Sequence, residues 1–194
     1  MELQYATGAT PLDPDEAAGL IPRHITTQAE LNEWEQTNIL EGAQWAFKQK
    51  NSDLLDEYFV RELHRRMFSK TWKWSGSFRL TDKNIGVDWQ QIPVQLRNLF
   101  DDVKAQIEFK AYPPDELALR FHHRLVWIHP FANDNGRHAR LMADLLIARL
   151  GVSPLSWGGQ SLVGASEKRA AYLAALKAAD ARDYQRLMQF ARSQ

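Results

Sequence analysis

The chain has 194 residues, of which 44% are hydrophobic, and this length predicts one domain with a full hydrophobic core. Its 24 lysines and arginines balance 24 aspartates and glutamates, so no overall positive field favours nucleic acid or an anionic membrane, and we expect no direct nucleic-acid binding. It contains no cysteine, which excludes disulfides and thiolate metal sites; with neither a signal-peptide pattern nor a membrane-length apolar run, the sequence predicts a cytoplasmic protein.

The N-terminal segment carries prolines and glycines at short intervals, and residues 1–26 are therefore predicted to form an extended arm. A helix is predicted over about residues 28–48, because Thr27 is followed three residues later by Glu30, the pattern of a capping box. Apolar residues at helical spacing predict a second helix from Asp53 to Met67.

Short alternating pieces interrupted by glycines follow, and they predict a β-hairpin at about residues 78–92. The C-terminal tail is predicted to hold one or two helices, and three further helices are predicted at residues 93–109, 115–129 and 136–150. Neither repeats nor linkers interrupt residues 27–194. We therefore expect a single, mainly α-helical domain with one short hairpin.

The segment HPFANDNGRHAR, residues 129–140, connects two of these helices and combines residue types that improve neither a helix nor a strand. The second helix starts near Gly136, where free main-chain N–H groups and the helix dipole attract phosphate and a glycine allows close approach. Asn135 adds a side-chain donor. Arg137 and Arg140 lie three residues apart on one helix face, and two guanidinium groups beside free amides form a site for a polyphosphate.

His129 is the side chain beside this site that can take a proton near neutral pH, so it is the candidate general base. Each residue alone also has an ordinary structural explanation, such as a buried histidine or a surface ion pair, but their order in one loop favours a functional site. A metal site of His122, His123 and His138 is not expected, because no carboxylate lies at ligand spacing and the arginines repel a cation. His122 is instead expected to support the loop through a hydrogen bond.

These residues in this order resemble the signature of the Fic family, HPFx[D/E]GNGRxxR. The likeness extends to FHHRLVWI before the loop, WSGSFR upstream and RAAYLAALKAAD downstream, so it covers most of the chain from about Thr27 onward. The opening segment ATPLDPDEAAGLIPRHITTQAELNEWEQTNI further resembles the small bacterial subfamily called mobile mystery protein B. That resemblance implies a partner encoded by a neighbouring gene.

The family resemblance implies a fold, a Fic-like helical bundle, and an activity: a protein adenylyltransferase transfers AMP from ATP to a serine, threonine or tyrosine hydroxyl of a target protein. By position, His129 would be the general base and Arg140 would reach the γ-phosphate. The α- and β-phosphates would be held by Asn135, the Gly136 amide and Arg137.

The hairpin at about residues 78–92 resembles the family's flap, where a segment of the target protein can add as an extra strand. The final arginine of the loop, Arg140, resembles the AMP-transferring members, because the signature of Doc-type kinases lacks it. The resemblance therefore implies cleavage at the α-phosphate of ATP rather than transfer of its γ-phosphate.

The loop departs from the signature at the acidic residue that holds Mg²⁺ or Mn²⁺ between phosphates, which is Asn133 here, and at the next glycine, which is Asp134. A neutral amide oxygen is a poorer ligand for a hard cation than a carboxylate. Asn133 could still bind the metal weakly, Asp134 could supply the carboxylate one residue later, or the metal site could be lost. The alternative function is therefore a catalytically weak or inactive nucleotide-binding regulatory protein on the same scaffold.

The segment TNILEG, Thr37 to Gly42, resembles the family's inhibitory motif [S/T]xxxE[G/N], whose glutamate pairs with the second arginine of the loop. By position, Thr37, Glu41 and Gly42 form this motif on the first predicted helix, and it implies autoinhibition through an ion pair between Glu41 and Arg140. Such a short pattern also arises by chance, and a solvated glutamate on a helix is the ordinary alternative.

Overall fold

The computed structural model describes residues 11–159 and 167–193, and over these residues the chain is mainly α-helical, as predicted. No helix in this part of the chain combines the length and the apolar character that crossing a bilayer requires. The helices are, in chain order, α1 (Pro14–Ala17), α2 (Gln28–Lys48), α3 (Glu57–Phe68), η1 (Trp89–Gln91), α4 (Ile92–Glu108), α5 (Pro114–Ile128), α6 (Asn135–Arg149), η2 (Trp157–Gly159), α7 (Glu167–Asp180) and α8 (Gln185–Arg192).

Most helix boundaries follow from local signals in the sequence. The predicted capping box starts α2, since the Glu30 N–H donates to the Thr27 hydroxyl at 3.2 Å and the Thr27 N–H donates to the Glu30 carboxylate at 3.0 Å. Helix α3 begins later than predicted, because Asp56 caps it while Asp53 closes the preceding turn onto the N–H of Leu55.

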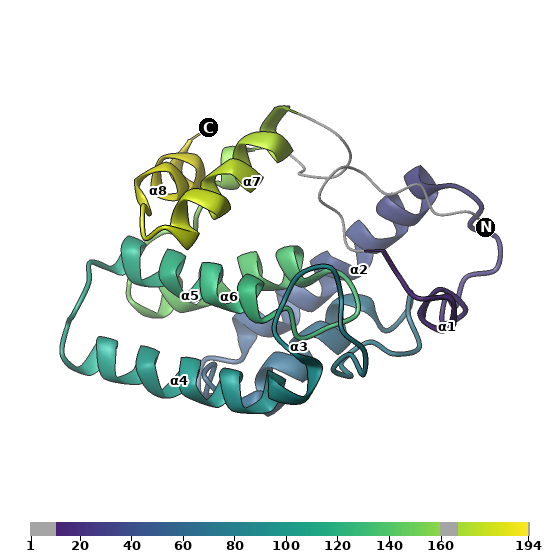
Figure 1. Cartoon of the computed structure of the whole chain (residues 1–194), viewed down its shortest axis with the longest axis horizontal. Helices are drawn as coiled ribbons and strands as arrows, with labels where there is room; N and C mark the ends of the chain where they lie inside the picture. The colour runs from purple at the N-terminus through teal and green to yellow at the C-terminus, as the bar shows by residue number, and fades with distance from the viewer. Residues whose placement is uncertain (1–10, 160–166, 194) are drawn as a thin grey trace.

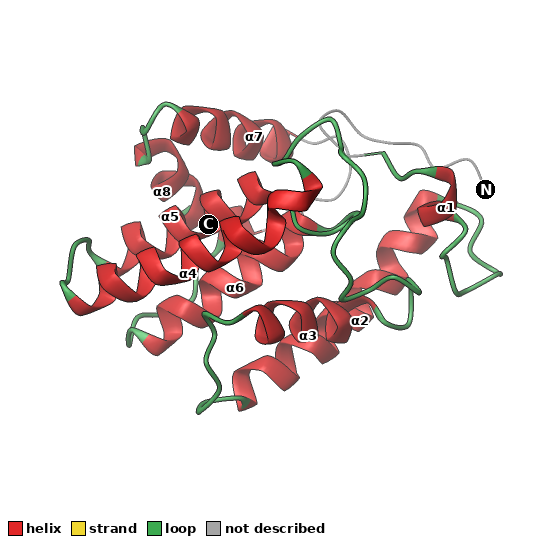
Figure 2. Cartoon of the chain, turned by 60° about the horizontal axis from the view of Figure 1, so that its bottom comes forward, coloured by secondary structure: helices red, strands yellow, loops and turns green. Residues whose placement is uncertain are grey.

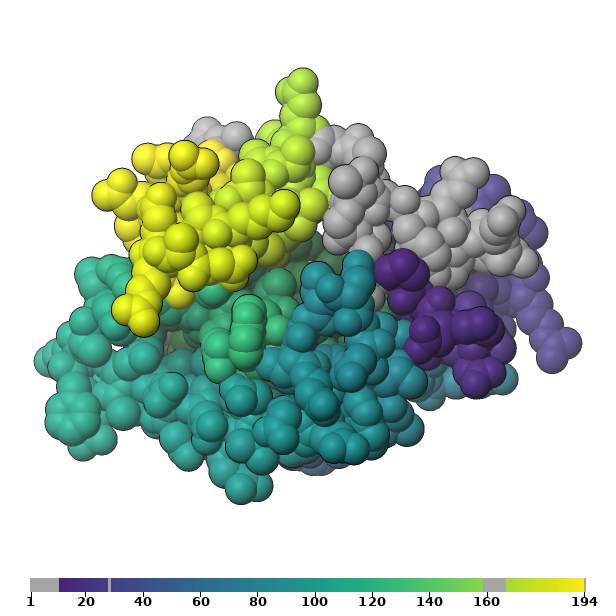
Figure 3. Space-filling view, viewed as in Figure 1, coloured from purple at the N-terminus to yellow at the C-terminus, as the bar shows by residue number. Residues whose placement is uncertain are grey.

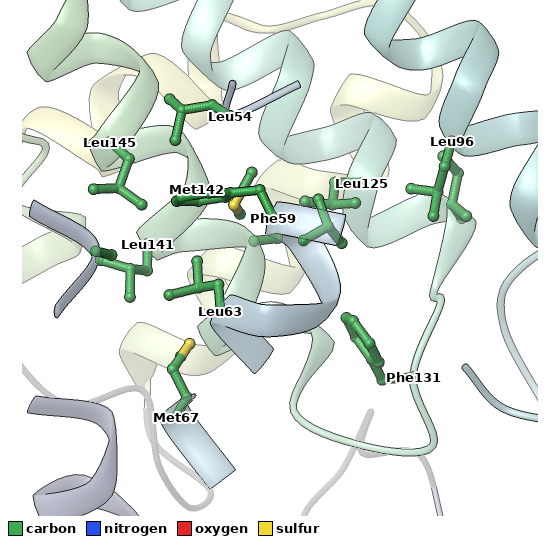
Figure 4. Close-up of a cluster of buried hydrophobic side chains, with 14 of the residues drawn as sticks. Leu54, Phe59, Leu63, Met67, Leu96, Leu125, Phe131, Leu141, Met142 and Leu145 are labelled. Atoms are coloured by element: carbon green, nitrogen blue, oxygen red, sulfur yellow. The ribbon is translucent and has the colours of Figure 1, made fainter. Parts of the chain in front are cut away.

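Helices α5 and α6 form the central pair of the domain (Figure 1). Helices α2, α3 and α4 pack on one side of this pair and α7 and α8 pack on the other, an arrangement that Figure 2 shows from a second direction. The larger core lies between α2–α4 and the central pair, and it gathers Phe59 and Leu63 of α3, Met142 of α6 and Phe131 of the α5–α6 loop (Figure 4). Phe131 is completely buried, so its packing in the core anchors the α5–α6 loop.

One side of α2 faces the loop because its buried residues recur every three or four positions. These residues are Leu31, Glu35, Asn38, Gly42 and Ala46. At Gly42 a Cβ atom would lie 2.8–3.0 Å from atoms of Met67, so the glycine allows α2 and α3 to approach closely. These five residues form a buried stripe along α2, and the carboxylate of Glu35 on this stripe faces the α5–α6 loop.

The predicted hairpin at 78–92 is wrong, since no strand occurs in this segment of the described chain. The main-chain N–H groups of Arg79 and Val87 donate instead to the carbonyls of Pro130 and Ile128, at 3.0 and 3.4 Å. The buried guanidinium of Arg79 donates to the carbonyls of Thr81 and Val87, so a side chain occupies the place of cross-strand hydrogen bonds. The segment is thus a loop fixed to the start of the 129–140 segment.

Residues 1–10 of the predicted N-terminal arm lie outside the described chain. The described part, residues 11–26, is not simply extended, since it contains α1 and pairs with residues that precede the 78–92 loop. Leu20 forms an antiparallel bridge with Trp72, the only such pairing in the described residues. The ammonium group of Lys83 lies 2.8 Å from the Asp13 carboxylate and 2.5 Å from that of Glu16. These contacts seat α1 against the loop that contains Lys83 (Figure 3).

Candidate active site

The α5–α6 loop keeps its shape through bonds among its own residues. His129 ends α5 in the left-handed conformation (φ 55°), which turns the chain sharply toward Phe131. The side-chain amide of Asn135 bonds both main-chain groups of Phe131: its oxygen accepts from the N–H at 2.9 Å and its nitrogen donates to the carbonyl at 2.8 Å. Asn135 therefore braces the loop, and its side chain is not the free phosphate donor that was expected; the main-chain N–H groups at the start of α6 are the candidates that remain.

The ring of His129 is buried and stays neutral at physiological pH. Burial, together with the nearby Arg79 and Lys83 cations, lowers the pKa of His129 to about 4. The main chain is fixed by Arg79, whose Nε donates to the carbonyl of His129 at 2.7 Å. A neutral imidazole can accept a proton, so the structure places His129 at the loop in the form that a general base requires.

The guanidinium of Arg137 is held by two buried carboxylates. Its Nη2 lies 2.6 Å from Glu35 Oε2 of the facing stripe on α2 and also contacts the carboxylate of Asp134. Glu35 in addition accepts a hydrogen bond from Trp72 Nε1 at 2.7 Å, and its side chain is only 2% exposed. Burial and the neighbouring Asp134 charge raise the pKa of Glu35 to about 7, while Arg137 acts in the opposite direction. The first arginine of the loop is therefore occupied.

Arg140 has a different environment, because among the described residues no carboxylate forms an ion pair with it. Burial lowers its pKa. A Cβ atom at Gly136 would lie 3.8 Å from Arg140 Nη1 and 3.8 Å from the hydroxyl of Tyr172, so both groups adjoin the start of α6. A partly buried cation beside the N–H groups at the start of a helix favours an anion there.

The expected pair of Glu41 with Arg140 is wrong in this structure. Glu41 is exposed and pairs with Lys70 on the surface at 2.6 Å. It lies one residue before the buried Gly42, just off the stripe by which α2 faces the loop, whereas Glu35 lies on that stripe. The glutamate that reaches the loop is therefore Glu35, and its partner is the first arginine rather than the second.

The residues at the expected metal position do not form a ligand set as they are arranged. The amide oxygen of Asn133 accepts the N–H of Asp134 at 2.8 Å, and the Asp134 carboxylate contacts Arg137. Asp134 Oδ2 is buried without a hydrogen-bond partner, but the adjacent guanidinium repels a cation. No group of three potential ligands among histidine, aspartate and glutamate occurs in the described residues. Asp134 has φ 64°, a left-handed conformation that glycine adopts easily and that aspartate tolerates.

Buried histidines contact the loop and the residues around it. The ring of His64 stacks on Phe131 with 3.7 Å between centroids, its Nδ1 accepts the N–H of Gly76 at 3.0 Å, and its Nε2 lies 3.4 Å from the carbonyl of Asn133. His122 was expected to hydrogen bond to the loop itself. Its Nε2 lies instead 3.0 Å from the hydroxyl of Tyr172 on α7.

Four residues of this site were missed in the sequence: Glu35, His64, Arg79 and Tyr172. Glu35 could have been found from the stripe at positions 31, 35, 38, 42 and 46, which places a carboxylate among small and apolar residues. Arg79 stands in WSGSFR, a segment already related to the loop by resemblance. For His64 and Tyr172 the sequence carries no signal beyond a polar residue on an apolar helix face.

Comparison with known proteins identifies related sequences. Residues 54–147 match the model of the Fic/DOC family. The chain is 30% identical over 128 residues to protein adenylyltransferase Fic of Nematostella vectensis and 30% identical over 129 residues to protein adenylyltransferase fic-1 of Caenorhabditis elegans. The matches cover 61% and 64% of this chain but 30% and 24% of those proteins, so the chain spans less than a third of either relative.

Solved structures resemble the fold. Fic-1 from C. elegans superposes with a TM-score of 0.64 at 25% identity, covering 90% of this chain and 51% of that one. BepC from Bartonella tribocorum, a translocated effector solved with bound AMPPNP, has a TM-score of 0.68 and covers 93% of this chain and 97% of its own, at 18% identity. At that identity the second likeness concerns the fold alone.

Proposed function

The chain contains a Fic/DOC family domain, and on this basis we propose that it is a protein adenylyltransferase, which transfers AMP from ATP to a serine, threonine or tyrosine hydroxyl of a target protein. The observation that carries the proposal is the environment of Arg140. A partly buried cation without a carboxylate partner in the described chain adjoins the start of α6, one short loop from the neutral ring of His129. The relatives named adenylyltransferases support the same activity.

In the proposed reaction His129 accepts the proton of the target hydroxyl as its oxygen attacks the α-phosphorus of ATP. The bond from the α-phosphorus to the bridging oxygen breaks, pyrophosphate leaves, and AMP remains on the target. The N–H groups at the start of α6, with Gly136 allowing close approach, and Arg137 would hold the α- and β-phosphates, and Arg140 would meet the γ-phosphate. The triphosphate brings negative charge, which raises the low pKa of His129 toward the working pH.

We propose that Glu35 restrains this activity. Its carboxylate, with that of Asp134, occupies Nη2 of Arg137, so a phosphate must displace a buried carboxylate to use this arginine. The role is the one that the sequence assigned to Glu41, which is bound to Lys70 at the surface instead.

The alternative is a nucleotide-binding regulatory protein with little or no transferase activity. The arrangement of Asn133 and Asp134 favours it, since neither residue presents a free oxygen in a setting that suits Mg²⁺ or Mn²⁺. No step of the proposed reaction is therefore assigned to a metal held by these residues.

The target protein is proposed to dock at the loop that contains residues 78–92, which is fixed to the start of the active-site loop. Membership of the mobile mystery protein B subfamily, and a partner encoded by a neighbouring gene, are proposals from the opening segment of the sequence. A cytoplasmic location is likewise proposed from the sequence.

The test uses ATP with a radioactive label at either the α- or the γ-phosphate, with Mg²⁺ or Mn²⁺. We expect protein labelling from the α-phosphate alone, stronger labelling in Glu35→Gln and none in His129→Ala. Labelling from the γ-phosphate would indicate a kinase. ATP binding without any labelling, in Glu35→Gln as well, would favour the regulatory alternative.

A further inference from the structure

Tyr172 of α7 adjoins the second arginine of the loop although it lies far from it in sequence. The hydroxyl of Tyr172 and Nη1 of Arg140 are both 3.8 Å from the position of a Cβ atom on Gly136. Cζ of Arg140 lies 5.5 Å from the centroid of the Tyr172 ring, so the guanidinium and the phenol are neighbours. A phenol of α7 thus belongs to the surroundings of the phosphate site.

The hydroxyl of Tyr172 is itself fixed from behind. Nε2 of His122 lies 3.0 Å from it, and both side chains are buried, with 0% exposure for His122 and 5% for Tyr172. Burial lowers the pKa of His122 to about 3, so the imidazole is neutral and does not add a positive charge beside Arg140. Trp157 closes the other side of the imidazole, with 4.7 Å between ring centroids.

The direction of the contact follows from the donors. Arginine only donates hydrogen bonds, so in a hydrogen bond between these neighbours the oxygen of Tyr172 is the acceptor. Unlike a carboxylate, a neutral phenol orients the guanidinium without cancelling its charge. Arg137, which two carboxylates hold, has no such freedom.

We propose that Tyr172 is a positioning residue of the phosphate site: its hydroxyl, anchored by His122, holds the Arg140 guanidinium beside Gly136, where the terminal phosphate of a nucleoside triphosphate binds. The proposal rests on the proposed function for the identity of the ligand. It makes Tyr172 a determinant of the preference for a triphosphate over a diphosphate, because Arg140 is the group assigned to the last phosphate.

The substitution Tyr172→Phe removes the hydroxyl and keeps the ring, including its contact with Phe190 at 5.6 Å between centroids. A second tyrosine–histidine pair provides a matched control. The hydroxyl of Tyr184, just before α8, lies 3.3 Å from Nδ1 of His123, the residue after His122 on α5. Tyr184→Phe therefore removes the same kind of bond away from Arg140. Thermal unfolding of both variants checks that each remains folded.

Two measurements test the proposal. In equilibrium titrations with ATP and ADP, Tyr172→Phe should weaken ATP binding by roughly 2- to 12-fold, the loss of one hydrogen bond, and leave ADP binding unchanged. Tyr184→Phe should change neither. Without nucleotide, the NMR signal of the Arg140 Nε–H group should shift and broaden in Tyr172→Phe and stay as in wild type in Tyr184→Phe.

The outcomes separate this proposal from the proposed function. An Arg140 signal that Tyr172→Phe leaves unchanged overturns the positioning role, whether or not ATP binds. A changed signal with unchanged ATP affinity, or equal weakening of ATP and ADP, overturns the link to the terminal phosphate. If wild type binds ATP but never transfers AMP, the enzymatic proposal fails while the result for Tyr172 stands.

Discussion

Replacing Glu35 by glutamine tests how strongly α2 restrains the loop. The change keeps the size of the side chain and removes its negative charge. The amide retains one oxygen, which can accept from Arg137, while Trp72 Nε1, which donates to the other carboxylate oxygen, loses its acceptor. Because Asp134 still contacts Arg137, the guanidinium is not left as an unpaired buried charge, and the several-kcal/mol loss typical of such a case is not expected.

The size of the effect follows from the 2.6 Å contact between Glu35 and Arg137. A hydrogen bond between charged groups contributes ~1.5–3 kcal/mol, and one to a neutral acceptor ~0.5–1.5 kcal/mol. The difference of ~1–1.5 kcal/mol corresponds to about tenfold in an equilibrium constant, so Glu35→Gln should bind ATP about tenfold more tightly at pH 8.

The advantage of Glu35→Gln should depend on pH. The pKa of Glu35 is raised to about 7, so the carboxylate is charged at pH 8 and mostly protonated at pH 6. Wild type should then approach the variant as pH falls through this value. Linkage gives the sign for stability as well: the folded chain holds a proton that the unfolded chain releases, so Glu35 makes wild type less stable as pH rises from about 4.5 to about 7.

The assay is calorimetric titration with ATP at pH 6 and pH 8, with Glu41→Gln as the control on the same helix. Glu41 pairs with Lys70 at the surface, so its replacement should leave ATP affinity unchanged. If Glu41→Gln strengthens ATP binding and Glu35→Gln does not, the assignment of the restraint to Glu35 is wrong. An equal gain for Glu35→Gln at both pH values would refute the argument from its raised pKa.

Three further changes have expected outcomes. Asn133→Asp, made together with Glu35→Gln, should increase Mg²⁺-dependent labelling about tenfold or more, since a carboxylate binds a hard cation better than an amide; unchanged metal dependence would exclude a metal role at this position. Asp134→Gly should shift the pH midpoint of ATP binding below 7, because the Asp134 charge helps to raise the pKa of Glu35; an unmoved midpoint in the titrations contradicts this coupling. Lys83→Met should lower the free energy of urea unfolding by ~1–2 kcal/mol, because it breaks the ion pairs of the buried Lys83 side chain with Asp13 and Glu16, whereas Lys70→Met at the exposed pair should not change it.

The helices of the core could be read from the sequence because their signals are local. The capping box at Thr27 starts α2, and a proline in the first turn marks α4 and α5 close to where the sequence placed them. The position of the loop and the start of α6 near Gly136 were also predicted from the sequence, because Pro130 ends the preceding helix and the run of polar residues after it interrupts the apolar helical pattern. The prediction of a hairpin was wrong because the Arg79 guanidinium donates hydrogen bonds to main-chain carbonyls that would otherwise accept them from a neighbouring strand.

The parts of the site that the sequence did not yield depend on contacts between distant residues. Glu35 and Glu41 both lie on α2, and it is Glu35 that shares the buried face with Gly42, where α2 packs against Met67, and that reaches Arg137. The inhibitory pattern therefore selected a carboxylate on the wrong face. Tyr172 lies in the C-terminal tail, for which the sequence predicted only one or two helices, and its place beside Arg140 follows from how α7 docks on the α5–α6 pair.

A crystal structure of the Glu35→Gln chain with a non-hydrolysable ATP analogue tests the central claim most directly. We expect the triphosphate at the start of α6, its terminal phosphate on Arg140, Arg137 turned from the carboxylates to the phosphates, and the ring of His129 facing the α-phosphorus. A nucleotide bound away from this loop, or a triphosphate at the loop that Arg137 and Arg140 do not contact, would contradict the account.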